Sequence, residues 1–227
     1  MTNLMTAADD AVLARSYDAF LFDMDGTLLN SIAVVERVWR EWAVEHGIEP
    51  EAFMRNLHGV RAIEVIRREA IPGLDAEEQA EIVLQKELDD VDGIVEIPGA
   101  AAFLSGLPPE RWAIVTSAVR SLALKRLAAT GLPVPKVLIC SDDVVNGKPD
   151  PEGYLKAARL LGFDPNDCVV FEDAHAGIEA AERMQAGVVV VTATHSIPAD
   201  VAHFRMRDYR DIAVDVGALG ELRLSKA

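Results

Sequence analysis

Residues 19–27 read Ala-Phe-Leu-Phe-Asp-Met-Asp-Gly-Thr, four apolar residues followed at once by two acids. Such a run is typical of a strand buried on both faces of a parallel sheet. Asp23 and Asp25 then lie at the carboxyl end of this strand, where open α/β sheets bind ligands. Residues at i and i+2 of an extended segment point the same way, so the two carboxylates favour a cation beside them. Gly26 permits a tight turn against a ligand.

Further apolar runs predict the remaining strands of the same sheet. They cover residues 112–115, 137–140, 168–171 and 188–191. The helical stretches between them are residues 118–129, 151–161 and 176–186, which end near Gly131, Gly162 and Gly187. Asp150 and Pro151 are typical of a helix start. This alternation predicts an α/β fold with a Rossmann-like parallel sheet and right-handed crossovers.

The segment from residue 32 to 97 breaks that alternation because it contains no clear strand. Its helical stretches are residues 32–47, 51–56, 62–69 and 75–92. Val35, Trp39 and Trp42 fall on one helical stripe, which indicates packing in a core. We therefore predict an α/β core of residues 16–31 and 98–218, with residues 32–97 inserted as a helical domain.

The charge balance narrows the class of partner. The chain has 22 lysines and arginines against 37 aspartates and glutamates, a net charge of −15, which argues against nucleic acid or an anionic membrane as the main partner. No apolar run reaches the roughly 18 residues of a membrane span. Residues 1–10 lack the features of a signal peptide and are interpreted as a disordered lead-in. Cys140 and Cys168 are interpreted as buried free thiols, and we expect a cytoplasmic monomer or weak homodimer.

Polar residues follow the other predicted strands as well. Thr116 and Ser117 follow the second strand, Lys148 lies between a glycine and a proline after the third, and Glu172 and Asp173 follow the fourth. Each has an ordinary explanation alone, such as a helix cap or a surface charge. Together with the first acid pair they bring four acids, two hydroxyls and an ammonium to one sheet edge. This set suits Mg²⁺ and phosphoryl transfer, with one carboxylate as covalent acceptor and another as acid/base.

These four segments resemble, in order, the four motifs of the haloacid dehalogenase superfamily over about residues 16–200. The helical insertion lies where that superfamily places a C1 cap. Residues 34–39, 58–61, 112–117 and 147–154 further resemble its sugar- and glycerol-phosphate phosphatases, including the 2-deoxyglucose-6-phosphatase group. The resemblance implies a Mg²⁺-dependent phosphatase that hydrolyses a small sugar or polyol phosphate through an aspartyl-phosphate.

The resemblance also implies roles for the acids. Asp23 would be the nucleophile and a Mg²⁺ ligand. Asp25 would be the acid/base and would offer its backbone carbonyl to the metal. Asp173 would bind Mg²⁺ directly or through water, with Glu172 in support.

The phosphoryl oxygens would be held by a second group of residues. The resemblance assigns this role to Thr116 and Lys148, helped by Ser117 and the backbone amides of Met24 and Asp25. His175 stands where relatives usually carry proline, and this departure affects only the expected geometry of its loop.

The insertion offers weaker candidates. His58, Gly59 and Arg61 form a short polar turn between helices. This turn is either solvated surface or a loop that descends over the site and contacts a substrate hydroxyl or phosphate. Glu36 is a second candidate, with a solvated helix face as the alternative. Asn30 and Ser31 are expected in the hinge of the cap.

Particular residues distinguish the expected phosphatase from related functions. A phosphomutase resembling β-phosphoglucomutase is the main alternative, but those relatives have histidine twelve residues after the nucleophile, where this chain has Val35. Dehalogenases of the superfamily replace the second acid of the first motif, and Asp25 is present. Receiver domains are short and lack both the cap and the paired acids. A catalytically dead scaffold would have no reason to keep every motif residue.

Overall fold

The computed structural model describes residues 12–54, 57–194 and 202–227, so the predicted lead-in of residues 1–10 lies outside the described residues. Its centre is a six-stranded sheet in which every neighbouring pair of strands is parallel, in the order β6-β5-β2-β7-β8-β9. The strands are β2 (Ala19–Phe22), β5 (Trp112–Val115), β6 (Val137–Ile139), β7 (Cys168–Glu172), β8 (Gly187–Val191) and β9 (Phe204–Met206). The predicted α/β class with a Rossmann-like sheet is confirmed.

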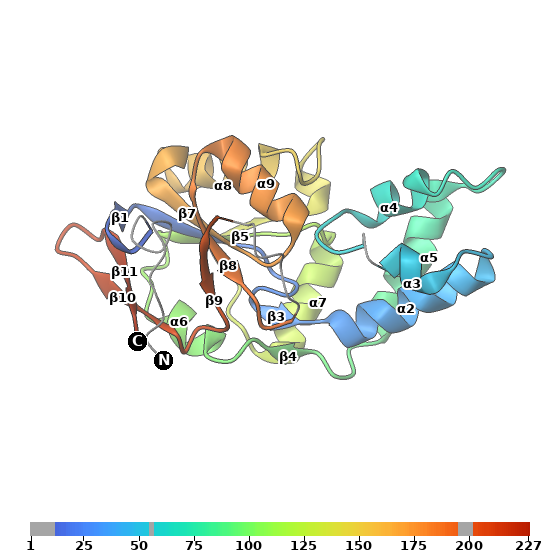
Figure 1. Cartoon of the computed structure of the whole chain (residues 1–227), viewed down its shortest axis with the longest axis horizontal. Coiled ribbons are helices and arrows are strands. Elements are labelled where there is room, and N and C mark those ends of the chain that lie inside the picture. Colours follow the sequence, from blue (N-terminus) through green and yellow to red (C-terminus); the bar gives the residue numbers. More distant parts are fainter. Residues whose placement is uncertain (1–11, 55–56, 195–201) are drawn as a thin grey trace.

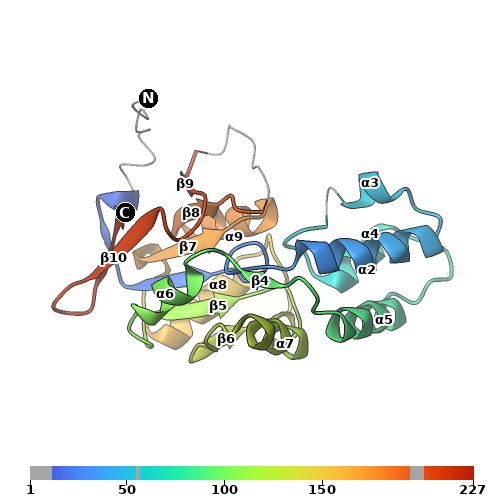
Figure 2. The same ribbon diagram turned by 90° about the horizontal axis from the view of Figure 1, so that it is seen from below.

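Helices cover both faces of the sheet (Figures 1 and 2). They are α6 (Ala100–Ser105), α7 (Arg120–Thr130), α8 (Glu152–Leu161) and α9 (His175–Met184). Successive side chains of β2 point to opposite faces. Phe20 and Phe22 therefore pack in the core cluster shared with α6 and α7, whereas Ala19 and Leu21 pack in the cluster shared with α8 and α9. Double coverage explains why the strand reads as an unbroken apolar run.

One predicted helix end was wrong. Helix α9 ends with Gln185 in the left-handed conformation, at φ +65°, rather than at Gly187. Gly187 begins β8, and a Cβ there would lie 2.9 Å from the hydroxyl oxygen of Tyr17. The glycine is required by close packing against Tyr17 and does not cap the helix.

The C-terminal region holds structure that the sequence analysis did not assign. Strands β1 (Ser16–Tyr17), β10 (Ile212–Val216) and β11 (Leu222–Lys226) form an antiparallel sheet in the order β1-β11-β10. Leu222 and Leu224 are buried in the main core cluster. The packed core therefore extends past residue 218, where the prediction ended it.

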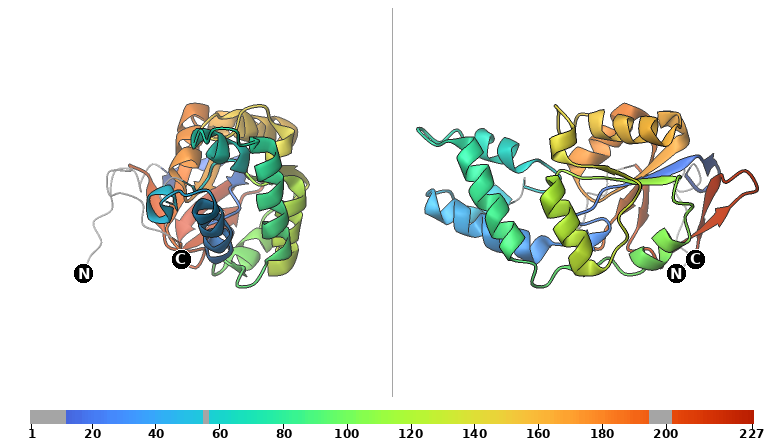
Figure 3. Two further views of the ribbon diagram at one scale, coloured as in Figure 1. Left: turned by 90° about the vertical axis from the view of Figure 1, so that its right-hand side faces the viewer. Right: turned by 180° about the vertical axis from the view of Figure 1, so that it is seen from behind.

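The inserted helices lie at one end of the molecule (Figures 1 and 3). They are α2 (Ile32–Glu45), α3 (Pro50–Met54), α4 (Ala62–Arg68) and α5 (Ala76–Asp89), and we call this group of four helices the cap. The chain enters and leaves it through β3 (Leu29–Asn30) and β4 (Val95–Glu96), which pair antiparallel. The rings of Trp39 and Trp42 both contact Phe53, with centroids 5.8 and 5.6 Å apart, which confirms that the two tryptophans pack in a core.

The two cysteines are buried free thiols, as predicted. Burial raises the pKa of Cys140 and of Cys168 to about 12. Among the described helices, none combines the length and the apolar character that a bilayer crossing requires.

Candidate active site

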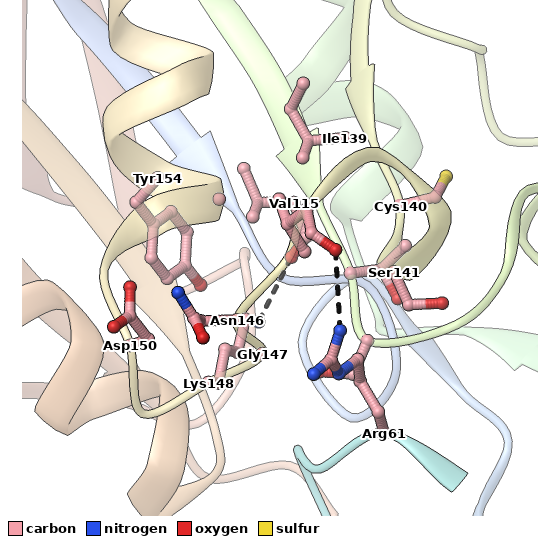
Figure 4. Close-up of a pocket in the computed structure, with 14 residues that line it drawn as sticks. Arg61, Val115, Ile139, Cys140, Ser141, Asn146, Gly147, Lys148, Asp150 and Tyr154 are labelled. Atoms are coloured by element: carbon pink, nitrogen blue, oxygen red, sulfur yellow. Dashed lines mark hydrogen bonds between the residues drawn. The ribbon is translucent and has the colours of Figure 1, made fainter. Parts of the chain in front are cut away.

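Asp23 lies where β2 ends, and residues from three other strand ends surround it. Its backbone N–H donates to the carbonyl of Phe171 in β7 at 3.0 Å, and its side chain is buried. The Nζ of Lys148, from the loop after β6, lies 2.5 Å from Asp23 Oδ1. The same Nζ donates to the carbonyl of Val115 at 3.1 Å and to Glu172 Oε1 at 2.7 Å. One buried ammonium thus joins the ends of β2, β5 and β7, and Figure 4 shows Lys148 beside Val115 and Tyr154.

Glu172 is held through both of its carboxylate oxygens. Oε1 accepts from Lys148 and, at 2.8 Å, from the hydroxyl of Tyr154. Oε2 accepts from the backbone N–H groups of Asp173 and Ala174 at 3.0 and 3.1 Å. A Cβ at Gly177 would lie 1.6 Å from Oε1, so the first turn of α9 needs a glycine there. With four donors in place, Glu172 orients Lys148 and supports the site from behind.

The side chains of Asp23, Glu172 and Asp173 form a buried cluster whose ligand atoms lie within 4.8 Å of one another. The hydroxyl of Thr27 donates to Asp173 Oδ1 at 3.1 Å. Gly26 has φ +90°, and a Cβ there would lie 1.9 Å from Asp173 Oδ2, so only glycine fits beneath this acid. The loop after β2 is therefore packed directly against Asp173 at the end of β7.

The charge of this cluster is incomplete without a cation. With all three carboxylates ionised, they face one ammonium, which leaves a net charge of −3 + 1 = −2 in a buried space. Burial raises the pKa of Asp23 and of Asp173 well above the usual range, while Lys148 acts in the opposite direction. A divalent cation would supply the missing charge, and oxygen donors of this kind suit Mg²⁺. The residues present fit the metal that the sequence implied.

Asp25 faces away from this cluster toward the cap. Its Oδ1 accepts from the hydroxyl of Ser31 at 2.6 Å and forms an ion pair with Arg126 Nη1 at 2.9 Å. The sequence analysis missed Arg126, which is buried in α7. The sequence did carry a signal for it. Arg126 lies on the same helical stripe as Leu122 and Ala123, and a charged residue on a buried stripe needs a partner.

The two hydroxyls after β5 lie differently from each other. Thr116 is buried, and its Oγ1 accepts from the N–H of Ala118 at 3.1 Å. The hydroxyl of Ser117 instead donates to the carbonyl of Gly59 at 2.8 Å, in the turn that precedes α4. Ser117 therefore contacts the cap, although the sequence analysis expected it only at the phosphoryl group.

A cavity of about 410 Å³ lies between the cap and the carboxyl edge of the sheet. Asp23, Asp25, Asp173 and Thr116 line its floor. The cap and the turn before α4 contribute mostly apolar side chains to its walls, namely Ile32, Val35, Trp39, Leu57, Val60, Ala62, Ile63, Ala80 and Leu84. Three of the four acids that the sequence singled out, Asp23, Asp25 and Asp173, thus open into one chamber that could hold a small organic molecule, whereas Glu172 is fully buried behind them.

Comparison with known proteins agrees with this geometry. The model of the family described as haloacid dehalogenase-like hydrolase matches residues 17–185. The chain belongs to this family. It is 40% identical over 186 residues to hexitol phosphatase A of Escherichia coli K12, covering 79% of this chain and 85% of that protein. It is 36% identical over 202 residues to 2-deoxyglucose-6-phosphate phosphatase 1 of Saccharomyces cerevisiae, covering 79% and 82%.

Solved structures of family members match the fold. A hydrolase from Pseudomonas syringae is 28% identical with a TM-score of 0.70, covering 83% of this chain and 92% of that one. A β-phosphoglucomutase from Clostridium difficile has a TM-score of 0.73 at 20% identity, covering 85% and 91%, and this likeness concerns the fold alone. The superfamily expected from the four motifs is confirmed.

The cap turn lies against the core of this haloacid dehalogenase-like hydrolase. His58, Gly59 and Arg61 all line the cavity. Gly59 has φ +77°, and a Cβ there would lie 2.7 Å from the Cβ of Ala174, so the turn approaches the core as closely as a glycine allows. This close approach means that the turn is not solvated surface.

Arg61 is engaged with protein groups rather than pointing freely into the chamber. It pairs with Glu64, and its Nη1 lies 3.5 Å from the carbonyl of Val144. A small second cavity of about 20 Å³ separates it from β5, and Figure 4 shows Arg61 reaching from the cap toward the loop of Asn146 and Gly147. Arg61 thus fastens the cap turn to a core loop.

The remaining candidates lie outside the chamber. Glu36 is exposed on α2 and is not among the residues that line the cavity. His175, at the start of α9, is also exposed, so the departure from the usual proline changes a surface position.

Proposed function

We propose that this chain is a Mg²⁺-dependent phosphatase that hydrolyses a monophosphate ester of a small sugar or polyol through an aspartyl-phosphate. The observation that carries the proposal is the buried Asp23–Lys148 pair beneath a capped chamber. Its relatives support the substrate class, since they are named hexitol phosphatase A, 2-deoxyglucose-6-phosphate phosphatase and glycerol-1-phosphate phosphohydrolase.

The side chains divide the reaction into two steps. In the first, a carboxylate oxygen of Asp23 forms a bond to phosphorus, the ester P–O bond breaks, and Asp25 gives its proton to the departing alcohol oxygen. In the second, Asp25 takes a proton from water, the water oxygen attacks phosphorus, and the Asp23–phosphorus bond breaks. Inorganic phosphate leaves and both acids return to their starting state.

Lys148 and Thr116, which lie beside Asp23 at the strand ends, would hold the phosphoryl group. Lys148 and Thr116 would neutralise and orient its oxygens as charge moves from the ester oxygen to the acceptor. Because Lys148 is fixed by Glu172 and by the carbonyl of Val115, it needs little reorganisation during the reaction.

Asp23, Asp173 and the backbone carbonyl of Asp25 would hold Mg²⁺, with Glu172 in support. When bound, the ion supplies positive charge that stabilises the transferring phosphoryl group.

The walls of the chamber favour an uncharged leaving group. Arg61 is paired with Glu64, and Arg126 is paired with Asp25 and Glu87. The acids Glu77, Glu81 and Asp142 also line the chamber. A second phosphate would meet these carboxylates without an unpaired arginine to balance it. Hydroxyl groups can bond to the acids, and Trp39 offers an apolar face to a sugar ring.

The main alternative, a β-phosphoglucomutase-like phosphomutase, finds less support at the wall. Val35 occupies the position where those relatives carry histidine, and it lines the chamber with an apolar side chain. An apolar group there cannot move a proton between substrate hydroxyls. Hydrolysis to inorganic phosphate is the outcome that this wall favours.

The test is a phosphate-release assay with and without Mg²⁺, using p-nitrophenyl phosphate and a panel of hexose, hexitol and glycerol monophosphates. We expect Mg²⁺-dependent release, fastest with a sugar or polyol monophosphate and slower with the matching bisphosphate. A parallel incubation with a hexose 1-phosphate and catalytic bisphosphate tests the alternative. Conversion to the 6-phosphate without phosphate release would overturn the proposal.

A further inference from the structure

Arg126 joins the catalytic loop to the cap through one guanidinium group. Its Nη1 lies 2.9 Å from Asp25 Oδ1, and its Nη2 donates to Glu87 Oε1 at 3.1 Å. Glu87 belongs to α5 of the cap, whereas Arg126 belongs to α7 of the core. The three charged groups therefore form a bridge from the predicted acid/base to a helix that lies outside the core.

This bridge is buried rather than superficial. Arg126 is 3% exposed and Glu87 is 6% exposed. Burial raises the pKa of Glu87, and Arg126 acts in the opposite direction. A buried ion pair adds little to stability compared with apolar residues of the same volume. Helices α5 and α7 could therefore be joined as well by apolar packing, and the charges point to a role beyond holding two helices together.

The two oxygens of Asp25 lie in different surroundings. Oδ1 is held by two donors, the hydroxyl of Ser31 and the guanidinium of Arg126. Oδ2 accepts no hydrogen bond from any of the described residues, and Asp25 lines the chamber. The pairing of Oδ1 fixes the carboxyl group and leaves Oδ2 for a substrate atom. Glu87 offsets the charge of Arg126, so Asp25 faces a guanidinium that is already paired.

We propose that Arg126 is a positioning residue for proton transfer by Asp25, and that Glu87 of the cap fixes Arg126 in that position. The inference rests on the proposed function, because it takes Asp25 as the acid/base. Its consequence is that the cap acts on the chemical step without touching the substrate. Docking of α5 against α7 orients the side chain that protonates the leaving group.

The leaving group provides the test. Release of an alkoxide from a hexitol or glycerol phosphate needs a proton, whereas p-nitrophenolate leaves readily without one. We expect Arg126→Met to lower kcat for the alkyl phosphate by about 10²-fold, the lower end of the range for lost acid/base catalysis. With p-nitrophenyl phosphate the loss should stay below about 10-fold. Glu87→Gln should move the same ratio in the same direction by a smaller factor.

Two further variants exclude a purely structural explanation. Arg126→Lys keeps a charge near Asp25 and should restore part of the alkyl-phosphate activity. Arg37→Met is the matched control, since Arg37 also pairs with an acid at the end of α5, namely Asp90, but is exposed and outside the chamber. It should leave the ratio between the two substrates at the wild-type value. Should Arg126→Met not fold, Arg126→Lys and Glu87→Gln measure the same ratio.

The outcomes separate this inference from the function on which it rests. Equal losses on both substrates would overturn the inference, because Arg126 would then support only the fold. A rise in alkyl-phosphate turnover would also overturn it, because Arg126 would be holding Asp25 away from the leaving group. In both cases the wild type still hydrolyses both substrates and the proposed function stands. A wild type that releases phosphate from neither would overturn the function itself.

Discussion

The core site and the cap meet at one chamber but are built in opposite ways. In the core, the functional side chains follow buried strands, and two of them have several buried partners: Lys148 has three acceptors and Glu172 has four donors. In the cap, many charged side chains form exposed pairs, such as Arg40 with Glu51, and the surface toward the chamber is mainly apolar. Under the proposed function, reactivity would therefore depend on a few side chains that several partners hold in place, whereas substrate choice would depend on a mainly apolar surface that is less tightly held.

The largest effect is expected at the centre of the core. Asp23→Asn removes the carboxylate that attacks phosphorus in the proposed mechanism while keeping the size of the side chain. We expect kcat to fall by about 10⁴-fold or more on every phosphomonoester, because none of the other described residues places a carboxylate where Asp23 lies. Rapid-quench detection of phosphoenzyme should find none. Turnover near the wild-type rate would contradict the assigned mechanism.

Metal removal tests the charge balance of the same region. Excess chelator should stop phosphate release, and Mg²⁺ at about 100 times its Kd should add roughly 2.7 kcal/mol to the free energy of unfolding. For a chain of this length that corresponds to a rise in Tm of about 5–10 °C, measured by calorimetry. Ca²⁺ should bind without supporting turnover, since its coordination shell is larger and looser.

Asp173→Asn is the control for that experiment. It should abolish the Mg²⁺-dependent rise in Tm, because it removes a charged ligand from the cluster. A full rise in the variant would place the ion elsewhere.

Lys148→Met tests whether the buried ion pairs of Lys148 with Asp23 and Glu172 stabilise the fold. The variant leaves Asp23 and Glu172 buried without their shared cation, which should cost about 3–5 kcal/mol of unfolding free energy besides abolishing turnover. The exposed Lys125→Met serves as the control and should change stability by no more than about 0.5 kcal/mol. Similar denaturation midpoints for the two variants would show that the buried pairs are not required for the fold.

Arg61→Ala asks whether the cap turn selects substrate or only fastens the cap. Since Arg61 pairs with Glu64 and reaches the carbonyl of Val144, we expect kcat/KM to fall by a similar factor, about 10-fold, on a sugar phosphate and on p-nitrophenyl phosphate. A loss confined to the sugar phosphate would show instead that the guanidinium contacts substrate hydroxyls.

The smallest effect is expected at Glu36, on the outer face of the cap. Glu36→Gln should leave both kcat/KM and Tm at wild-type values, within about 0.5 kcal/mol, because the side chain is exposed and outside the chamber. A change in the ranking of substrates would mean that the outer face of α2 also contributes to substrate selection, in addition to the apolar inner face.

The strands of the core and the polar residues at their ends could be predicted from the sequence, because both depend on patterns within a few neighbouring residues. A continuous apolar run predicts a doubly covered strand, and a polar residue directly after it must lie at the carboxyl edge of the sheet. This rule located Asp23, Thr116 and Asp173 without knowledge of any contact. Even in the core, the hydrogen-bond partners of these side chains could not be predicted. Glu172, for example, accepts a hydrogen bond from Tyr154, which is eighteen residues away in the sequence.

The contacts between the cap and the core were decided only by tertiary structure. Glu87 and Arg126 are separated by 39 residues and lie on helices of different domains in the predicted division. Arg126 lies on the buried side of α7, so its partners come from segments that are distant in the sequence, and neither periodicity nor spacing could pair it with Asp25. The same holds for Ser117, which donates a hydrogen bond from the core to Gly59 of the cap turn, and for the pairing of β11 with β1. Local sequence determined which polar groups lie at the sheet edge, because they directly follow buried strands, and long-range packing determined which partners hold them.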